Sequence, residues 1–153
     1  MAVLNEIYTE EERKYYDVPL SDGIQDIIFD LCEKYELEPT LILAVIKKES
    51  RFVIDAMSSD GRCYGLMQIH RINHNRLRET LGITDFLDPQ QNIHAGVFMI
   101  RELLDKYEDL TMALMCYNSG ETGARNQIKI GIISTYYTRK IYEYMSEFKF
   151  KDN

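Results

Sequence analysis

The hydrophobic positions of the chain recur mainly every three or four residues, which is the period of an amphipathic helix. Residues 24–31 and residues 93–104 each place their aliphatic side chains on one side of such a helix. Ser21, Pro39 and the pair Asp88-Pro89 stand where helices begin. No stretch alternates convincingly between apolar and polar residues as a strand does. The helices predicted from this pattern span residues 21–35, 40–50, 72–81, 88–107, 111–118 and 134–148.

The gap between the second and third helices, residues 51–64, holds a cluster of small and polar residues and predicts an irregular loop. Gly82 ends the third helix, and Ser119-Gly120 breaks the fifth. A chain of 153 residues fits one compact domain. We therefore expect an all-α, predominantly helical fold, with residues 1–20 as an N-terminal extension and residues 21–153 as the folded domain.

Composition and charge exclude several classes of protein. Hydrophobic residues make up 45% of the chain and charged residues 28%, a balance typical of globular rather than disordered proteins. The net charge of −7 argues against nucleic acid as a partner, because phosphate binding normally requires a basic face. No apolar run approaches the roughly 20 residues of a membrane helix, so we expect no membrane insertion. Residues 1–16 lack the basic and apolar regions of a secretory signal, and the route of export is left open.

One carboxyl group falls on the apolar side of its predicted helix. Ile42, Val45 and Ile46 share a face of the helix over residues 40–50, and Glu49 follows them at helical spacing. Partial burial and the negative end of the helix dipole both disfavour the anion, so we expect a raised pKa, as a general acid needs. The alternative is a surface glutamate that ends an amphipathic helix or pairs with one of the two preceding lysines.

Four short motifs follow one another along the chain: Glu49-Ser50, Gly65-Leu66-Met67-Gln68, Asn92-Ile93 with Gly96, and Cys116-Tyr117-Asn118. Their order and spacing resemble the catalytic domain of the soluble lytic transglycosylases, in the superfamily that also includes goose-type lysozymes. The resemblance covers roughly residues 24–145. It implies a lysozyme-like fold with a substrate groove and an irregular loop after the helix that carries the catalytic acid.

The same resemblance implies a function and a setting. The substrate would be the glycan strand of peptidoglycan, cut at the β-1,4 bond between N-acetylmuramic acid and N-acetylglucosamine, with formation of a 1,6-anhydro end and without a cofactor. The enzyme would act at the bacterial cell wall, outside the cell or in the periplasm. A phage, secretion or conjugation assembly is a possible context.

Carried over residue by residue, the resemblance makes Glu49 the catalytic acid. Cys116 stands where the family usually has alanine, and Ile133 where an acidic residue often precedes the final tyrosine. Most of the implied binding residues also have a purely structural interpretation, such as core packing, a turn or a helix end. The substrate-binding residues that the resemblance implies are Ser50, Ser58, Gly65, Met67, Gln68, Tyr117, Asn118 and Tyr137.

A single carboxyl group distinguishes this mechanism from that of most glycosidases, which use two. Glu49 would act first as acid and then as base, while the substrate's own hydroxyl attacks. A hydrolytic muramidase of goose type would need a second carboxylate, for which Asp55 and Asp60 are the loop candidates. A non-catalytic peptidoglycan-binding module on the same fold is the third interpretation.

The cysteines and histidines match no common metal-binding motif. We expect the cysteines to be free thiols that fill the core, and the histidines to be packed or solvated, with no metal bound. The residues concerned are Cys32, Cys63, Cys116, His70, His74 and His94.

Overall fold

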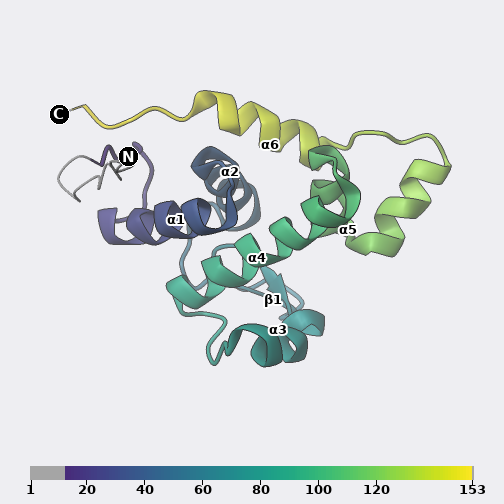
Figure 1. The fold of residues 1–153 in the computed structure, drawn as a ribbon, viewed down its shortest axis with the longest axis horizontal. Helices are drawn as coiled ribbons and strands as arrows, with labels where there is room; N and C mark the ends of the chain where they lie inside the picture. Colours follow the sequence, from purple (N-terminus) through teal and green to yellow (C-terminus); the bar gives the residue numbers. More distant parts are fainter. Residues whose placement is uncertain (1–12, 153) are drawn as a thin grey trace, which may run out of the picture.

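The computed structural model describes residues 13–152, so the acidic first twelve residues and the expectations for them lie outside it. Its elements confirm the predicted, mainly helical fold class (Figure 1). The helices are α1 (Asp22–Tyr35), α2 (Pro39–Ser50), α3 (His74–Leu81), α4 (Pro89–Tyr107), α5 (Leu110–Lys129) and α6 (Tyr136–Glu147). A short hairpin, β1 (Cys63–Tyr64) and β2 (Ile69–His70), and the 3-10 turn η2 (Arg71–Asn73) connect α2 to α3.

Helix α2 is the most deeply buried element. Every residue from Leu41 to Ile46 is buried, so the helix is covered on all sides and not only on one face. Helix α6 packs against it, and α1 also contacts it. Burial on all sides explains why the apolar run of this helix is nearly continuous where a surface helix would show a stripe. Its last turn, with Glu49, is therefore anchored by the core.

The predicted helix starts agree with the structure. The Ser21 hydroxyl accepts a hydrogen bond from the backbone N–H of Ile24, and the Asp88 carboxylate accepts one from that of Gln91. Pro39 begins α2, where its missing N–H costs nothing. Helix α4 then packs against α1 and α5, and the hairpin and α3 lie together on its other side (Figure 1).

Helix α5 differs from its prediction. The chain does break at Gly120, whose φ of 75° and ψ of 160° are not helical, but helix resumes and reaches Lys129. The prediction ended this helix at Asn118. The second half was missed because residues 121–129 are mostly polar and bury only Ala124 completely, so they carry almost no hydrophobic period.

The hairpin was also missed. Cys63 pairs with His70 and Tyr64 with Ile69, in antiparallel register. Strands of two residues are too short to show alternation in the sequence. The turn between them, residues 65–68, contains two left-handed residues, Gly65 with a φ of 75° and Gln68 with a φ of 50°.

The buried side-chain amide of Asn92 joins the hairpin to α4. Its oxygen accepts a hydrogen bond from the backbone N–H of Met67 at 2.8 Å, and its nitrogen donates to the carbonyl oxygens of Tyr64 and Phe86 at 2.7 Å each. A Cβ at Gly65 would lie 2.4 Å from the same amide nitrogen. Glycine is therefore required here both by its φ angle and by the close approach of Asn92.

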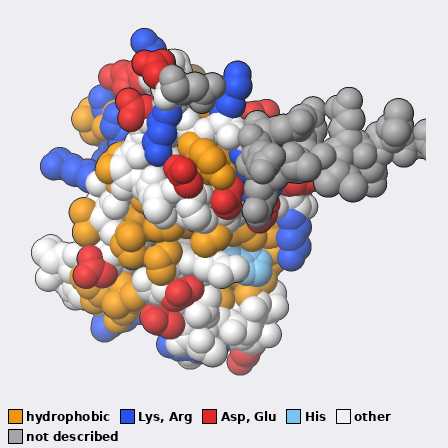
Figure 2. Space-filling view, turned by 90° about the vertical axis from the view of Figure 1, so that its left-hand side faces the viewer, with side chains coloured by type: hydrophobic (Ala, Val, Ile, Leu, Met, Phe, Trp, Pro, Cys, Tyr) orange, Lys and Arg blue, Asp and Glu red, His pale blue; other side chains and the backbone are white. Residues whose placement is uncertain are grey.

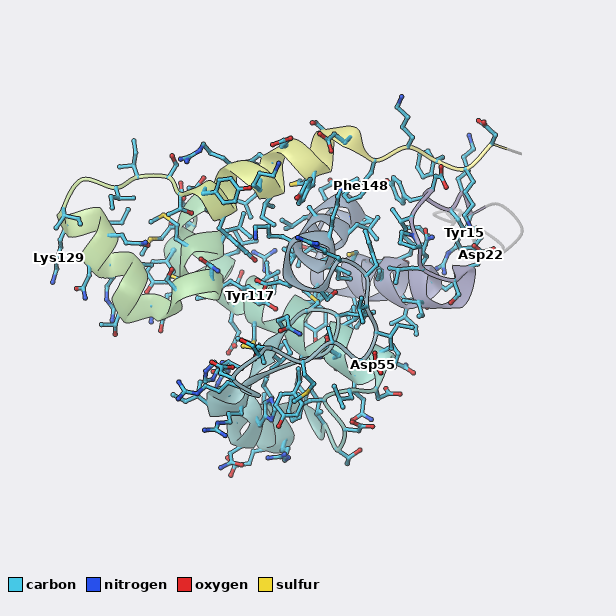
Figure 3. All side chains as sticks on the ribbon, turned by 180° about the vertical axis from the view of Figure 1, so that it is seen from behind. Tyr15, Asp22, Asp55, Tyr117, Lys129 and Phe148 are labelled. Carbon is cyan, nitrogen blue, oxygen red and sulfur yellow. The ribbon has the colours of Figure 1, made fainter. Side chains whose placement is uncertain are left out.

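The two ends of the described chain lie side by side. Tyr16 forms a bridge with Phe150, and their rings stack at 4.4 Å between centroids. The buried Gln25 amide bonds both backbone groups of Tyr16, so this segment is held against α1. Figure 3 shows Tyr15 and Phe148 at the same end of the molecule, opposite Lys129.

The surface at this end carries acidic, basic and hydrophobic side chains intermixed (Figure 2). Over residues 13–152, none of the helices is long and apolar enough to cross a membrane.

We predict that Asn92→Ala destabilises the fold by at least about 3 kcal/mol, because three backbone groups, two of them in buried hydrogen bonds, lose their partner at once. Urea denaturation followed by circular dichroism measures the free energy of unfolding. Asn75→Ala is the matched control, since the exposed Asn75 side chain accepts only a surface hydrogen bond from Arg78. Equal losses in the two variants would show that the Asn92 amide does not hold the hairpin.

Candidate functional site

The Glu49 carboxylate lies in the last turn of α2, partly buried and facing α6. The Tyr137 hydroxyl donates a hydrogen bond to its Oε1 at 2.8 Å. Tyr137 is itself buried, in the first turn of α6, and α6 is packed along α2. The packing of two helices far apart in sequence thus holds an acid and a phenol in direct contact.

Burial raises the pKa of Glu49 above its usual value, and two neighbours act in the opposite direction. The hydrogen bond from Tyr137 and the charge of Lys48 each lower the pKa, because both stabilise the anion. The Lys48 ammonium lies 5.9 Å from the centre of the Tyr136 ring and 5.8 Å from that of Tyr137. Glu49 is therefore biased towards its protonated form, while groups that support the anion stay within reach.

The chain turns sharply after this acid. Arg51 and Phe52 both have positive φ angles, 51° and 65°, which is unusual for two successive residues other than glycine. Ser50 is buried, and its hydroxyl donates to the carbonyl of Ile46 within α2. These contacts give Ser50 a structural role at the helix end.

Met67 is placed by its backbone. Its N–H donates to Asn92, and its carbonyl accepts a hydrogen bond from the Tyr117 hydroxyl at 2.7 Å. Its side chain is fully buried against Gly96, where an added Cβ would lie 2.3 Å from the Met67 sulfur. The Met67 side chain therefore fills the core beneath the turn.

Gln68 and Ser58 organise the loop between α2 and the hairpin. The Gln68 side-chain nitrogen donates to the carbonyl oxygens of Ala56 and Gly65. The Ser58 hydroxyl donates to Asp60 and accepts from the backbone N–H of Cys63. Both side chains are partly exposed, so each combines a structural hydrogen bond with surface that a ligand can reach.

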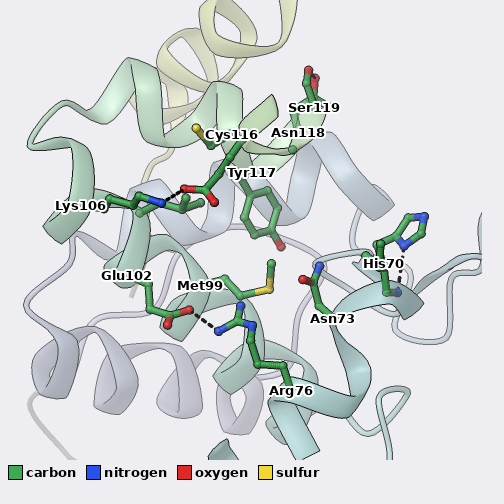
Figure 4. Close-up of a pocket in the computed structure, with 14 residues that line it drawn as sticks. His70, Asn73, Arg76, Met99, Glu102, Lys106, Cys116, Tyr117, Asn118 and Ser119 are labelled. Carbon is green, nitrogen blue, oxygen red and sulfur yellow. Dashed lines mark hydrogen bonds and ion pairs between the residues drawn. The ribbon is translucent and has the colours of Figure 1, made fainter. Parts of the chain in front are cut away.

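A pocket of about 670 Å³ opens beside Tyr117, whose ring points into it (Figure 4). Asn118 is exposed and lines the same pocket, whereas Glu49 is not among its lining residues. Helices α4 and α5 form one wall, and the segment from β2 to α3 forms the other. Tyr117 therefore stands between this pocket and the hairpin turn that its hydroxyl contacts.

Two ion pairs cross the pocket lining, and no pattern in the sequence predicted them. Arg76 pairs with Glu102 at 2.8 Å, and Lys106 pairs with Glu121 at 2.7 Å. Each of these residues is an ordinary charged position on a helix, so no sequence pattern sets it apart. The pocket thus offers paired charges around an aromatic ring.

Cys63 departs from the expectation that the cysteines fill the core. Cys32 and Cys116 are buried, but Cys63 on β1 is only partly so. Burial raises the pKa of the Cys63 thiol, a hydrogen bond with Ser58 lowers it, and the charges of Glu49 and Asp60 raise it by smaller amounts.

The histidines serve packing and loop contacts. The His74 ring stacks on Phe86 with 3.7 Å between ring centroids and bonds the carbonyl of Ile69. His94 contacts the Tyr35 hydroxyl, and His70 accepts from the backbone N–H of Ile72. Within residues 13–152, the histidine, cysteine and carboxylate side chains do not gather into a group that could hold a metal ion.

The structure thus sorts the predicted site residues into groups. Tyr137 donates a hydrogen bond to Glu49. Tyr117 and Asn118 line the pocket. The turn that Tyr117 contacts contains Gly65, Met67 and Gln68. Ser50 supports the end of α2, and Ser58 supports the loop that follows it. Asn92 belongs to one of the four sequence motifs but had no predicted function. In the structure it connects the turn to α4.

The chain is similar in sequence to known proteins. Residues 26–135 match the model of the transglycosylase SLT domain. The chain is 36% identical over 91 residues to the transglycosylase of Enterobacteria phage PRD1, covering 60% of this chain and 32% of the relative. It is 33% identical over 111 residues to membrane-bound lytic murein transglycosylase F of Desulfosudis oleivorans, and the match covers 68% of this chain and 23% of that protein. It is also 30% identical over 129 residues to the X polypeptide of Escherichia coli, covering 79% and 75%.

Solved structures show the same fold. The lytic transglycosylase Slt from Pseudomonas aeruginosa superposes with a TM-score of 0.70 at 20% identity, over 83% of this chain and 24% of that one. The 70-kDa soluble lytic transglycosylase of Escherichia coli superposes with a TM-score of 0.68 at 18% identity, over 84% of this chain and 24% of that one. The chain spans a third or less of the phage relative and of these enzymes. By its sequence and its fold, the chain belongs to the transglycosylase SLT domain family.

Proposed function

We propose that this chain is a peptidoglycan lytic transglycosylase, with residues 21–153 as the catalytic domain. It would cleave the β-1,4 bond between N-acetylmuramic acid and N-acetylglucosamine and leave a 1,6-anhydro end. The observation that carries this proposal is the partly buried Glu49 carboxyl group, which accepts a hydrogen bond from the Tyr137 hydroxyl. The names of the relatives, which include a lytic murein transglycosylase, support the substrate class.

In the first half of the reaction, Glu49 acts as a general acid. Its pKa, raised by burial, favours the protonated form that can donate to the glycosidic oxygen as the bond to C1 breaks. The N-acetyl carbonyl of the muramic acid residue stabilises the positive charge that develops at C1. The substrate thus supplies the group that a second carboxylate supplies in most glycosidases.

In the second half, the same residue acts as a base. The Glu49 anion takes the proton from the C6 hydroxyl of the same sugar while the C6 oxygen attacks C1 and closes the anhydro ring. The Tyr137 hydroxyl and the Lys48 charge stabilise the anion during this interval. Attack within one sugar gains from proximity, so no bound water has to be activated.

The two other loop carboxylates differ from Glu49 in their surroundings. The Asp60 carboxylate accepts hydrogen bonds from the Ser58 hydroxyl and the Arg62 backbone, which lower its pKa. Asp55 and Asp60 are both exposed, whereas Glu49 is partly buried. Glu49 is therefore the carboxyl group whose surroundings suit a general acid.

The remaining site residues would bind the glycan or support the segments that bind it. Tyr117 and Asn118 offer a ring and an amide on the pocket side, and Gln68 and Ser58 offer polar groups on the loop side. Gly65 keeps the turn close to Asn92, and Ser50 and Met67 act as supports. The place of action would be the bacterial cell wall, outside the cell or in the periplasm. The phage relative fits a phage assembly as one context.

We predict that Glu49→Gln lowers the rate of peptidoglycan solubilisation by a factor on the order of 100 to 10,000, because the side-chain amide is too weak an acid to donate a proton to the glycosidic oxygen. The amide oxygen can still accept the Tyr137 hydrogen bond, so thermal unfolding should match that of the parent chain. Glu79→Gln, at an exposed position of α3, is the control and should keep full activity. Near-parental rates in Glu49→Gln would disprove the assignment.

We predict that every new glycan end released by the parent chain lacks one water relative to a reducing end. Mass spectrometry of digested purified peptidoglycan measures this difference. A digest with only reducing ends would identify a hydrolytic muramidase instead. Binding to insoluble peptidoglycan without any released product would identify a binding module.

We predict that Tyr137→Phe moves the alkaline limb of the pH profile of kcat/KM to higher pH. The Tyr137 hydrogen bond lowers the Glu49 pKa, so its loss raises that pKa and keeps the acid protonated at higher pH. Tyr136→Phe is the control, because Tyr136 is exposed and the hydrogen bond to Glu49 comes from Tyr137. An unchanged alkaline limb together with a lower rate would assign Tyr137 a packing role only.

A further inference from the structure

The connection between α5 and α6 exposes an unusual set of aliphatic side chains. Ile130 and Ile133 are each 77% exposed, Ile128 is 41% exposed and Ile132 is 37% exposed, and Tyr136 follows at 66%. We call residues 128–136 the isoleucine loop. Single exposed hydrophobic residues are common, but contiguous ones mark an interaction surface.

The charged residues in the stretch of sequence that contains this loop all have one sign. From residue 122 to residue 142 the chain contains Arg125, Lys129, Arg139 and Lys140 and no acidic residue. The chain as a whole has 25 acidic residues and a net charge of −7, so this stretch differs from the average. Lys140 pairs with Glu143 at 2.9 Å, which leaves three exposed cations beside the loop.

The loop projects from one end of the molecule. It lies beyond the body formed by α1, α2 and α4, on the side opposite both chain ends (Figure 1). Lys129 stands at that outer edge in Figure 3. The opposite end, seen in Figure 2, carries charges of both signs intermixed. Apolar side chains and excess positive charge therefore coincide at one projecting end.

We propose that the isoleucine loop docks on the surface of an anionic lipid bilayer. Aliphatic side chains and a tyrosine can enter the region between headgroups and acyl chains, while neighbouring cations meet lipid phosphates. This binding is superficial, and it agrees with the finding that no helix over residues 13–152 could span a membrane.

Two other occupants fit the loop less well. A second copy in a twofold dimer would place the same surface against itself and oppose Arg125, Lys129 and Arg139 to their own copies. A soluble polyanion would satisfy these cations but leave Ile130 and Ile133 in water. A bilayer with acidic headgroups satisfies both kinds of side chain at once.

Co-sedimentation of the purified full chain with lipid vesicles tests this proposal. We expect binding to vesicles of equimolar phosphatidylglycerol and phosphatidylethanolamine and little binding to phosphatidylcholine. Lys129→Gln should weaken the binding about fivefold, as expected for one cation near an anionic surface. The double variant Ile130→Ser, Ile133→Ser should weaken it at least about tenfold, because apolar burial is lost.

Matched controls separate this surface from general charge and hydrophobicity. Lys14→Gln removes the same charge at an exposed position near the other end, and Val53→Ser, Ile54→Ser removes aliphatic groups from an exposed loop. Both should bind as the parent chain does. Equal losses in controls and loop variants, or no sedimentation of the parent chain with anionic vesicles, would overturn the proposal. So would lipid-free self-association that is lost in the isoleucine variant, which would identify a second copy as the occupant.

Discussion

Three hydrogen-bonding groups in series hold the site together: the Asn92 amide, the backbone of Met67 and the Tyr117 hydroxyl. They connect α4, the hairpin turn and α5. Because Met67 has both backbone groups engaged and its side chain buried, the turn cannot shift without breaking one of these bonds. The position of Tyr117 over the pocket is therefore determined by an amide in a different helix.

The protonation of Glu49 depends on a second constraint: burial raises its pKa, and hydrogen bonding lowers it. The core around α2 removes water from the carboxyl and favours its neutral form. The α6 phenol and the neighbouring ammonium favour the anion. A residue that must donate a proton and later recover one needs both forms to be accessible, so neither influence can dominate. The packing of α6 on α2 sets this balance, because it brings Tyr137 to the acid.

Much of the helical fold could be read from the sequence, since Ser21 and Asp88 cap where the periodicity begins and Pro39 starts α2. The hairpin and the second half of α5 could not, because they lack a hydrophobic period. Helical spacing alone singled out Glu49. Its partner Tyr137 lies 88 residues away, and only the resemblance to a known family could suggest it. No local pattern reports that two distant helices touch, nor that Arg76 and Glu102 face the same pocket.

The bridge from Tyr16 to Phe150 gives the fold an architectural freedom. Entry and exit of the polypeptide are adjacent, and they are remote from the pocket beside Tyr117 (Figure 3). A unit with neighbouring ends can be inserted into, or appended to, a larger polypeptide without rearranging its interior. In the Pseudomonas aeruginosa and Escherichia coli enzymes, the matching region is about a quarter of the whole molecule. Because the chain ends are remote from the pocket, segments can be added at those ends without changing the pocket itself.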